Sequence, residues 1–371
     1  MERFDKLFDE TKIAEKLHLW QSDFLVDEKK FCGIGLNNAM DSRELFIDNT
    51  CAKANIHFPV DWVLLRDGAR SLLSAIKTIR NQGLKHRMIE PSELMSKMNK
   101  LCISMTQTRR KKDSKKRRKK ILRDMKKLSH CIRKHAERYR ALLIKRREET
   151  DWSEAQAEQV INRIDNILNQ LPAAINQAHE RIIGERQISS EEKILSLYDP
   201  DAHVIVRGKS GSEVEFGQGL LLTEQKDGLI VDWKLFQDQP KADSVLLKET
   251  IKRIQTHYGD ITSIAGDRGF HSKDNDNFLK QNNILNAICP KNIDLMQKKL
   301  SDQKFLELQK RRSQTEARIG IFKNVFLGRP IKSKGFLHRK IKVTWCVVTH
   351  NLWVIARKAL ADEKSNLQNA A

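Results

Sequence analysis

The spacing of apolar residues divides the chain into three regions. Residues 1–59 are mixed, but Leu45-Phe46-Ile47 is a continuous apolar run that predicts a buried strand ending at Asp48. Residues 60–190 repeat apolar side chains at helical spacing, with very few glycines or prolines, which predicts helices. From residue 195 onward, short apolar runs alternate with helical spacing, which predicts strands and helices in turn.

The helical region over residues 60–190 is predicted to hold three helices. The first covers residues 63–79, and Pro91-Ser92-Glu93 begins the second, which we expect to continue to about Arg147. The third begins near Asp151 and keeps one apolar stripe. Because two long antiparallel helices with a short connection form an αα-hairpin, we expect a coiled-coil-like helical insertion here.

The final region predicts a sheet domain with helices. In chain order the sequence predicts strands at 203–208, 217–225 and 228–236, a helix at 244–259, a strand at 260–267, a short helix at 272–283, a strand at 285–290, and helices after that. With the strand that ends at Asp48, this order resembles an α/β, ribonuclease-H-like mixed sheet flanked by helices. The predicted parts are an N-terminal helical remnant or leader, the first strand of the sheet domain, the basic helical insertion, the rest of the sheet domain and a tail, over residues 1–42, 43–59, 60–190, 191–360 and 361–371.

The composition favours a protein that binds a polyanion. The chain of 371 residues has 69 Lys and Arg against 48 Asp and Glu, a formal net charge of +21, and 39% hydrophobic residues that can build a core. Nucleic acid is the leading partner for a protein this basic. No apolar run approaches the roughly 18 residues of a membrane span, and the N-terminus has no apolar signal core. The six cysteines form no C-x-x-C pair, which argues against a zinc site and favours a reducing cytoplasm.

The densest positive charge lies in residues 108–140. Such a run is often only a solvated helix face, or a segment extended by self-repulsion. Here Ile121, Met125, Leu128 and Ile132 keep helical spacing within the run, so one side is apolar and the other is cationic. A helix of this kind suits contact with the phosphates of a DNA backbone, which carries little sequence information. The residues expected to make these contacts are Arg109, Arg110, Lys115, Lys116, Arg117, Arg118, Lys119 and Lys120.

The segment ITSIAGDRGFHS, residues 261–272, ends an apolar run on Asp267. Asp and Gly are common in tight strand-to-helix turns for backbone reasons alone. An acid at the carboxyl end of a strand in an α/β sheet also lies where ligands and metals bind. Asp48 has the same two interpretations, because it closes an apolar run and Asn49 after it also favours a turn.

A third acid, Glu316, lies in a predicted helix with Arg312 and Lys323. At about 100° per residue these three side chains fall within roughly 40° of one another on one face. The ordinary explanation is a solvated face with an Arg–Glu pair worth about 0.2–0.5 kcal/mol. The alternative is a carboxylate between two cations, which suits a metal held beside a phosphate backbone. Acids from two strands and a late helix would hold two Mg²⁺ (or Mn²⁺) ions about 3.5–4 Å apart.

Three blocks of the sequence resemble the catalytic blocks of bacterial insertion-sequence DDE transposases, in the superfamily with a Tyr-Arg-Glu-Lys signature. They are FIDNT around Asp48, IAGDRGF around Asp267, and R-x(3)-E-x(6)-K at Arg312, Glu316 and Lys323. The tyrosine of the signature is replaced by Gln309. Residues 54–70 also resemble a block of the subset that carries a helical insertion after the first catalytic strand, and the resemblance covers roughly residues 45–360.

The resemblance implies a DNA transposase. Asp48, Asp267 and Glu316 would be its catalytic residues and metal ligands, while Arg312, Lys323 and Arg268 would contact DNA. Metal-dependent hydrolysis at the element's ends would free a 3′-hydroxyl, which would then attack target DNA. The resemblance further implies transposon-end and target DNA as partners, a homodimer in a synaptic complex, no membrane, and a nucleoid-associated location in the bacterial cytoplasm.

Several alternatives remain at the level of sequence. Family members usually carry an N-terminal DNA-binding domain, whereas 47 residues precede Asp48 here. A truncated or repurposed transposase that binds DNA or a sister transposase without catalysis is therefore the second hypothesis. A basic RNA- or ribosome-associated coiled coil is the third. Asp61, Asp199 and Asp201 compete for the first catalytic position, but only Asp48 closes an apolar run and is followed by x-Thr.

The sequence offers no chemical role for three other reactive residues. His350 and Cys346 lie in an apolar segment that predicts the core of a closing helix, and His57 is also expected to be structural.

Overall fold

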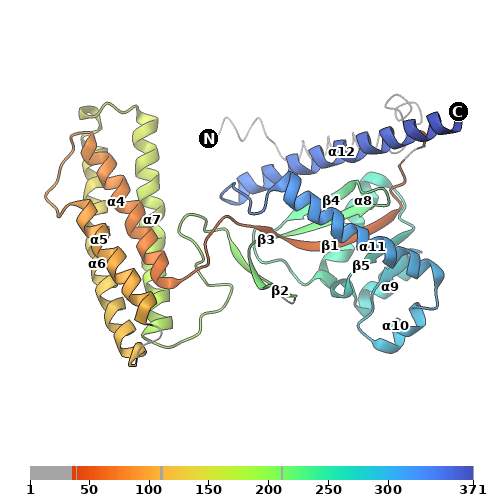
Figure 1. The fold of residues 1–371 in the computed structure, drawn as a ribbon, viewed down its shortest axis with the longest axis horizontal. Coiled ribbons are helices and arrows are strands. Elements are labelled where there is room, and N and C mark those ends of the chain that lie inside the picture. The colour runs from red at the N-terminus through yellow and green to blue at the C-terminus, as the bar shows by residue number, and fades with distance from the viewer. Residues whose placement is uncertain (1–35, 39, 109–111, 210–211, 371) are drawn as a thin grey trace. The chain divides into compact units, whose positions relative to one another are not determined.

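The computed structural model describes residues 36–38, 40–108, 112–209 and 212–370, and it divides into two compact units. One unit is helical and covers Ile56–Val204, and the other contains the sheet and is formed by the chain on either side of it (Figure 1). Most of the predicted N-terminal leader, together with Arg109 and Arg110 of the basic run, lies outside the described residues.

The helical unit consists of α-helices packed around one apolar core. They are α4 (Asp61–Asn81), α5 (Pro91–Gln107), α6 (Ser114–Lys145) and α7 (Glu154–Ile182). Tyr139 is the largest fully buried side chain of this core. Its hydroxyl donates a hydrogen bond to the His86 carbonyl and accepts one from the His86 backbone amide. Ser153 and Gln156 form a reciprocal capping box at the start of α7, which satisfies backbone donors there. Each long helix buries an apolar stripe of side chains against this core and exposes its opposite face.

The prediction of one continuous helix from residue 91 to about 147 is wrong, whereas α6 and α7, which are long, joined by a short connection and in contact, form a helical hairpin as predicted. The chain instead turns between α5 and α6, where Asp113 has a left-handed backbone with φ of 60°. Residues 107–120 contain no apolar side chain, so nothing in that stretch holds a straight helix against a core. Turning back lets both α5 and α6 bury their apolar stripes, including Met105 and Met125, against α4.

The sheet unit contains a mixed six-stranded sheet. Its strands are β1 (Glu44–Lys53), β2 (His203–Lys209), β3 (Ser212–Gln225), β4 (Ile230–Leu235), β5 (Ser263–Gly266) and β6 (Leu285–Ile288). The order is β2-β3-β1-β5-β6, with β4 also pairing with β3. β1 runs antiparallel to β3 and parallel to β5, which in turn runs parallel to β6. The predicted α/β class, with a mixed sheet and flanking helices, is confirmed.

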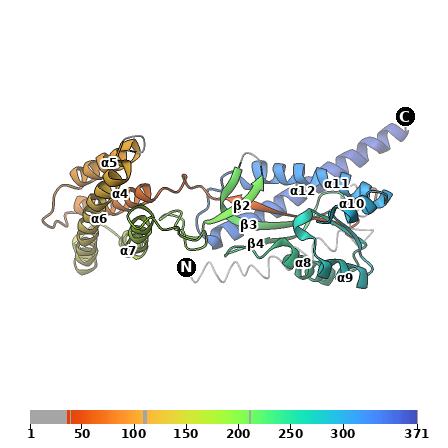
Figure 2. The same ribbon diagram turned by 90° about the horizontal axis from the view of Figure 1, so that it is seen from below.

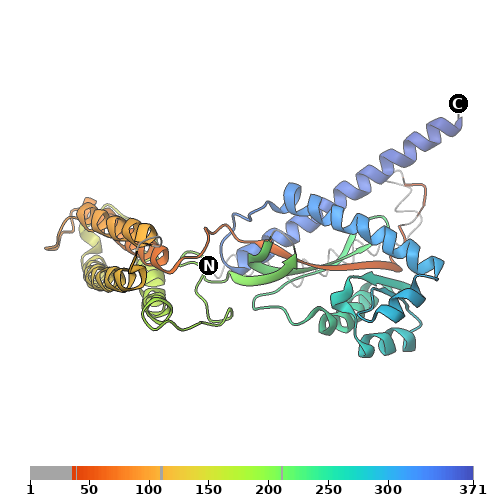
Figure 3. The ribbon, with the colours of Figure 1, turned by 60° about the horizontal axis from the view of Figure 1, so that its bottom comes forward.

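Helices cover both faces of the sheet (Figures 2 and 3). They are α8 (Asp243–Tyr258), α9 (Lys273–Gln281), α10 (Ile293–Lys299), α11 (Gln303–Ile321), a π-helical segment (Phe322–Leu327) and α12 (Phe336–Ala370). Leu45 and Ile47 of β1 pack with α8 and α9, while Phe46 packs with α11. Because side chains alternate along a strand, even-numbered residues of β1 face α11 and odd-numbered residues face α8.

A buried amide joins α12 to the sheet. Asn351 accepts a hydrogen bond from the backbone N–H of Ile230 (2.9 Å) and donates one to its carbonyl (2.9 Å). Asn351 is fully buried and Ile230 is 4% exposed, so water cannot replace these bonds. Within the described residues, no helix combines the length and the apolar character that crossing a membrane would need.

We expect Asn351→Ala to lower the free energy of unfolding of the sheet unit by about 1–3 kcal/mol, because it leaves both buried backbone groups of Ile230 without partners. Chemical denaturation followed by circular dichroism measures the change. Thr349→Ala, at an exposed position of the same helix, is the matched control and should change the value by less than about 0.5 kcal/mol. Equal effects of the two substitutions would contradict the role given to Asn351.

Candidate functional site

The parallel pairing of β1 and β5 brings two of the predicted acids together. Ile47 lies opposite Gly266 in the register of the two strands, and Asp48 and Asp267 are the next residue on each. Adjacent strands are about 4.8 Å apart. The two acids therefore lie side by side on neighbouring strands, Asp267 directly after β5 and Asp48 within β1. Because β1 continues to Lys53 through its pairing with β3, the prediction that this strand ends at Asp48 is wrong.

The backbone around Asp267 holds its carboxylate in place. Asp267 precedes a short 3-10 turn, Arg268–Phe270, and its Oδ1 accepts a hydrogen bond from the Gly269 amide (2.8 Å). A Cβ on residue 269 would lie 2.6 Å from Oδ2 of Asp243 and 2.9 Å from Oδ1 of Asp267. A methyl group at residue 269 would therefore force one or both of these carboxylates to shift. Arg268 is exposed beside this turn.

Asp243 is an acid of the site that the sequence interpretation missed. It is the first residue of α8 and accepts a hydrogen bond from Nδ2 of Asn49 at 2.7 Å. Asn49 directly follows Asp48, and Gly269 lies between Asp243 and Asp267. An Asp in the first turn of a helix resembles ordinary capping, so only the spatial contact with Gly269 and Asn49 identifies it.

The third predicted acid lies on the exposed side of α11. Glu316 pairs with Arg312 (Nη1 to Oε1, 3.1 Å), and its side chain is 53% exposed. Arg312 also donates to Gln309, which stands at the tyrosine position of the family signature and itself donates to the Ala287 carbonyl of β6. Gln309 thus links the Arg312–Glu316 pair to the sheet.

Lys323 connects the end of α11 to β1. It belongs to the π-helical segment that continues α11, is 8% exposed, and donates from Nζ to the Thr50 hydroxyl at 2.9 Å. Thr50 lies two residues after Asp48 on the same face of β1. π-Helical turns often occur at functional sites. This one places the buried Lys323 ammonium against Thr50, which is two residues after Asp48 in the sequence.

A buried carboxylate fixes α11 against the sheet. Glu224 of β3 is 4% exposed and accepts from the Thr315 hydroxyl (2.7 Å) and from Arg311 (2.9 Å). Arg318 lies 3.7 Å from the same carboxylate, and its own pKa is lowered, mainly by burial. The Arg311 guanidinium also lies over the Phe46 ring, 4.5 Å from its centre. These contacts set the position from which Arg312 and Glu316 project.

The described residues contain no group of three or more His, Cys, Asp or Glu side chains placed to hold a metal ion. The register brings Asp48 and Asp267 together, and no described group includes Glu316 with them as a closed ligand set. The donors that are present are carboxylate oxygens, which are the ligand type that Mg²⁺ and Mn²⁺ prefer. The chemistry of the site therefore fits such an ion at Asp48 and Asp267.

The cationic side chains of α6 that the sequence predicts to contact DNA fall into three groups. Lys116, Arg117 and Lys120 are exposed and have no ion-pair partner among the described residues. Lys115 and Lys119 are paired with Glu185, at 3.2 and 2.8 Å. Arg118 lies over the indole ring of Trp62. The apolar stripe of the same helix contains the buried residues Leu122, Met125 and Ile132, with Ile121 and Leu128 partly buried.

The competing residues have structural partners. Asp61 is 5% exposed and accepts a hydrogen bond from Nη1 of Arg181 at 2.7 Å. Asp199 and Asp201 belong to the helical unit. His57 pairs with the buried Asp67 (2.6 Å).

Near the end of the chain, His350 is buried among aromatic rings, and burial lowers its pKa. Cys346 donates to the Phe326 carbonyl, and burial raises the pKa of its thiol.

Comparisons of the chain with protein-family models, with curated proteins and with solved structures find no match.

We expect Glu224→Ala to lower the free energy of unfolding by about 3 kcal/mol, because it removes the buried carboxylate that pairs with the partly buried cations Arg311 and Arg318. Glu249→Ala is the control: that carboxylate pairs with Lys234 and Arg253 but is 57% exposed, so the loss should stay below about 1 kcal/mol. Urea denaturation of both variants measures the difference. A loss at Glu224 no larger than at Glu249 would show that the buried network does not hold α11.

Proposed function

We propose that the protein is a DNA transposase that hydrolyses phosphodiester bonds at the ends of a mobile element and transfers the freed strand to target DNA. The observation that carries the proposal is the register of β1 and β5, which sets Asp48 and Asp267 side by side where the parallel pairing of the two strands ends. Both acids lie in the sequence blocks that resemble DDE transposases. A pair of carboxylates at such an edge is a usual beginning of a two-metal nuclease site.

The order of the strands supports a ribonuclease-H-like sheet. Leaving out β2, the order is β4-β3-β1-β5-β6, in which β3 alone runs antiparallel to the central β1, β5 and β6. The helical unit is inserted after β1 and the chain returns before β3. The sequence blocks that resemble DDE transposases imply the same order of elements, so fold and motifs support the same proposal.

Each residue of the proposed site has a definite task. Asp48 and Asp267 would hold Mg²⁺ or Mn²⁺ through carboxylate oxygens, with Glu316 joining from α11. Such ions supply Lewis acidity, which activates the attacking oxygen and neutralises charge on the leaving oxygen. Arg312 and Arg268 would contact the phosphate backbone near the acids. Lys323 would fix the position of β1 beside Asp48 through Thr50.

A second candidate function is DNA binding without catalysis. It is favoured by the exposed, unpaired cations of α6, which lie in a helical unit with its own core. A truncated or repurposed transposase would keep this surface and lose the reaction. In either case the proposed partner is DNA, in the bacterial cytoplasm, and a homodimer would bring two element ends together.

We expect Asp267→Asn to lower the rate of Mg²⁺- or Mn²⁺-dependent nicking of end-sequence DNA by at least about 100-fold, because one metal-binding carboxylate is lost. Gel assays of nicking and strand transfer measure the rate. Asp260→Asn, at an exposed acid before β5, should leave the rate unchanged. Undiminished nicking by Asp267→Asn would exclude the catalytic assignment, and absence of nicking in the unaltered chain would favour the second candidate.

The cationic surface of α6 predicts a salt dependence that can be measured separately. Each phosphate contact contributes about 0.9 to the slope of log affinity against log salt concentration. Replacing Lys116, Arg117 and Lys120 together by Gln should therefore reduce the slope by about 2–3. Fluorescence anisotropy with a duplex in a chelator, at several salt concentrations, gives the slope.

The matched control replaces three exposed lysines of the sheet unit, Lys241, Lys252 and Lys273. If both triple variants lower the slope equally, binding follows net charge alone and α6 has no particular role.

A further inference from the structure

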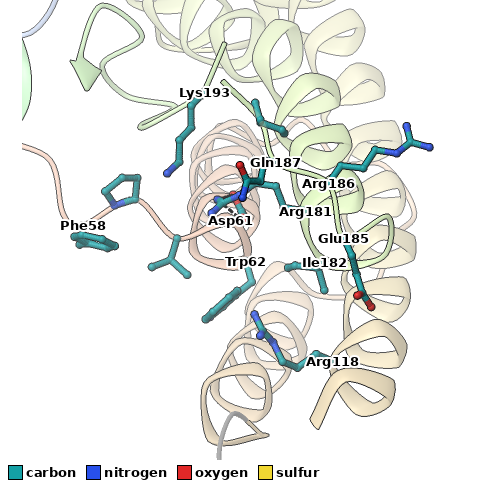
Figure 4. A pocket seen from close by; sticks show the side chains of 13 residues that line it. Phe58, Asp61, Trp62, Arg118, Arg181, Ile182, Glu185, Arg186, Gln187 and Lys193 are labelled. Carbon is teal, nitrogen blue, oxygen red and sulfur yellow. Dashed lines mark hydrogen bonds and ion pairs between the residues drawn. The ribbon is translucent and has the colours of Figure 1, made fainter. Parts of the chain in front are cut away.

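The helical unit contains an open pocket of about 690 Å³. It is formed by the segment before α4, the first turns of α4 and α6, the end of α7 and the chain that follows α7 (Figure 4). Its volume lies in the range of about 300–1,000 Å³ typical of pockets for small ligands. None of the acids of the sheet site takes part in it, so the pocket is a separate feature of the molecule.

Two aromatic side chains form part of the wall. Phe58 is 73% exposed, so its ring has no place in the core of the unit. The Trp62 indole is held by a hydrogen bond from Nε1 to the Thr106 hydroxyl (3.3 Å) and lies 5.0 Å from the Arg118 guanidinium. Figure 4 shows Phe58, Trp62 and Arg118 around the same opening. An exposed ring beside a ring with a stacked guanidinium is a surface on which a planar base can stack.

The acids that line the pocket are already neutralised. Asp61 is bound by Arg181, which donates from Nη1 to both of its oxygens at 2.7 and 2.8 Å, and by Gln177 at 3.0 Å. Glu185 at the rim accepts from Lys115 and Lys119, and these bonds lower its pKa. The negative charges of Asp61 and Glu185 are therefore balanced by cations of the protein.

Arg186 in the lining pairs with Glu180 at 2.9 Å, but two other cations of the pocket, Arg118 and Lys193, have no such partner among the described residues. Within the described residues Arg118 has no carboxylate partner, and its buried Nε has no hydrogen-bond acceptor. Lys193, on the opposite side of the opening, pairs with no carboxylate in the described part of the chain; burial and the nearby Arg181 lower its pKa. The pocket thus combines aromatic rings with unsatisfied positive charge, which is suited to an aromatic base that carries phosphate.

We propose that this pocket binds an unpaired nucleotide of a DNA strand, with its base against Phe58 and Trp62 and its phosphates at Arg118 and Lys193. A paired base has both faces covered by its neighbours in the duplex, so it cannot reach the rings, whereas an unpaired or extruded base can. The proposal rests on the proposed function only in taking DNA as the partner. It adds a preference for distorted or single-stranded DNA to the contacts that α6 makes with the backbone.

The test measures binding of the full chain to three labelled duplexes of the same length in a chelator, so that no cleavage occurs. One duplex is fully paired, one has a single unpaired thymidine, and one has an abasic site at that point. We expect the unpaired thymidine to bind at least about 5-fold more tightly than the other two, since stacking of one base is worth about 1–3 kcal/mol. Equal binding of the paired and unpaired duplexes overturns the proposal.

Variants identify the pocket as the source of the preference. Phe58→Ala removes an exposed ring, so it should leave the fold intact while lowering the preference for the unpaired thymidine about 5-fold or more. Arg118→Gln should lower it as well. Arg123→Gln is the matched control, because Arg123 is an exposed cation of α6 outside the pocket and should weaken binding of all three duplexes alike. An unchanged preference in Phe58→Ala, with native circular dichroism, overturns the proposal.

Two further outcomes separate neighbouring explanations. Thymidine monophosphate at the concentration of the labelled duplex should not compete, and effective competition would mean that the pocket holds a free nucleotide instead of a strand. The duplex preference is measured without metal, so it is independent of the nicking assay on Asp267→Asn. If the unaltered chain showed no nicking but still preferred the duplex with the unpaired thymidine, the catalytic proposal would fail and the proposal for the pocket would stand.

Discussion

The central position of β1 is the constraint on which the sheet unit depends. The strand pairs with β3 on one edge and with β5 on the other, in opposite senses, and its two faces are covered by different helices. A shift of one residue in this register would exchange the two faces of the strand. It would carry Phe46 away from α11 and Ile47 away from α8, so packing on both faces fixes the register. The same register determines that Asp48 stands beside Asp267.

The surroundings of Asp48 are held from both faces of the sheet. Asn49 donates to Asp243 at the start of α8, and Thr50 accepts from Lys323 beyond the end of α11. These two residues face opposite sides, because side chains alternate along the strand. Movement of α8 or of the π-helical segment would therefore be transmitted to the residues next to Asp48. An arrangement of this kind keeps a carboxylate in position more firmly than a loop would.

Local sequence patterns predicted most elements because apolar periodicity directly reflects which face is buried. The strands at 217–225 and 285–290 and the helix at 244–259 correspond to β3, β6 and α8 within a few residues. The apolar periodicity does not predict the break between α5 and α6, because it resumes at Ile121 after residues 107–120, which contain no apolar side chain. Asp243 was missed because its role depends on contact with Gly269 and Asn49, which are distant in sequence.

The point of insertion keeps the helical unit and the sheet unit separate along the chain. The helical unit begins after β1 and ends at β2, so the chain leaves and re-enters the sheet unit without passing between β1 and β5. Its core is separate from the cores under the sheet, so the strongly basic α6 and the buried Glu224 network belong to different units. Under the proposed function, DNA phosphates would offset the repulsion among the cations of α6. An acid pair in the sheet and a cationic helix outside it can thus coexist in one chain.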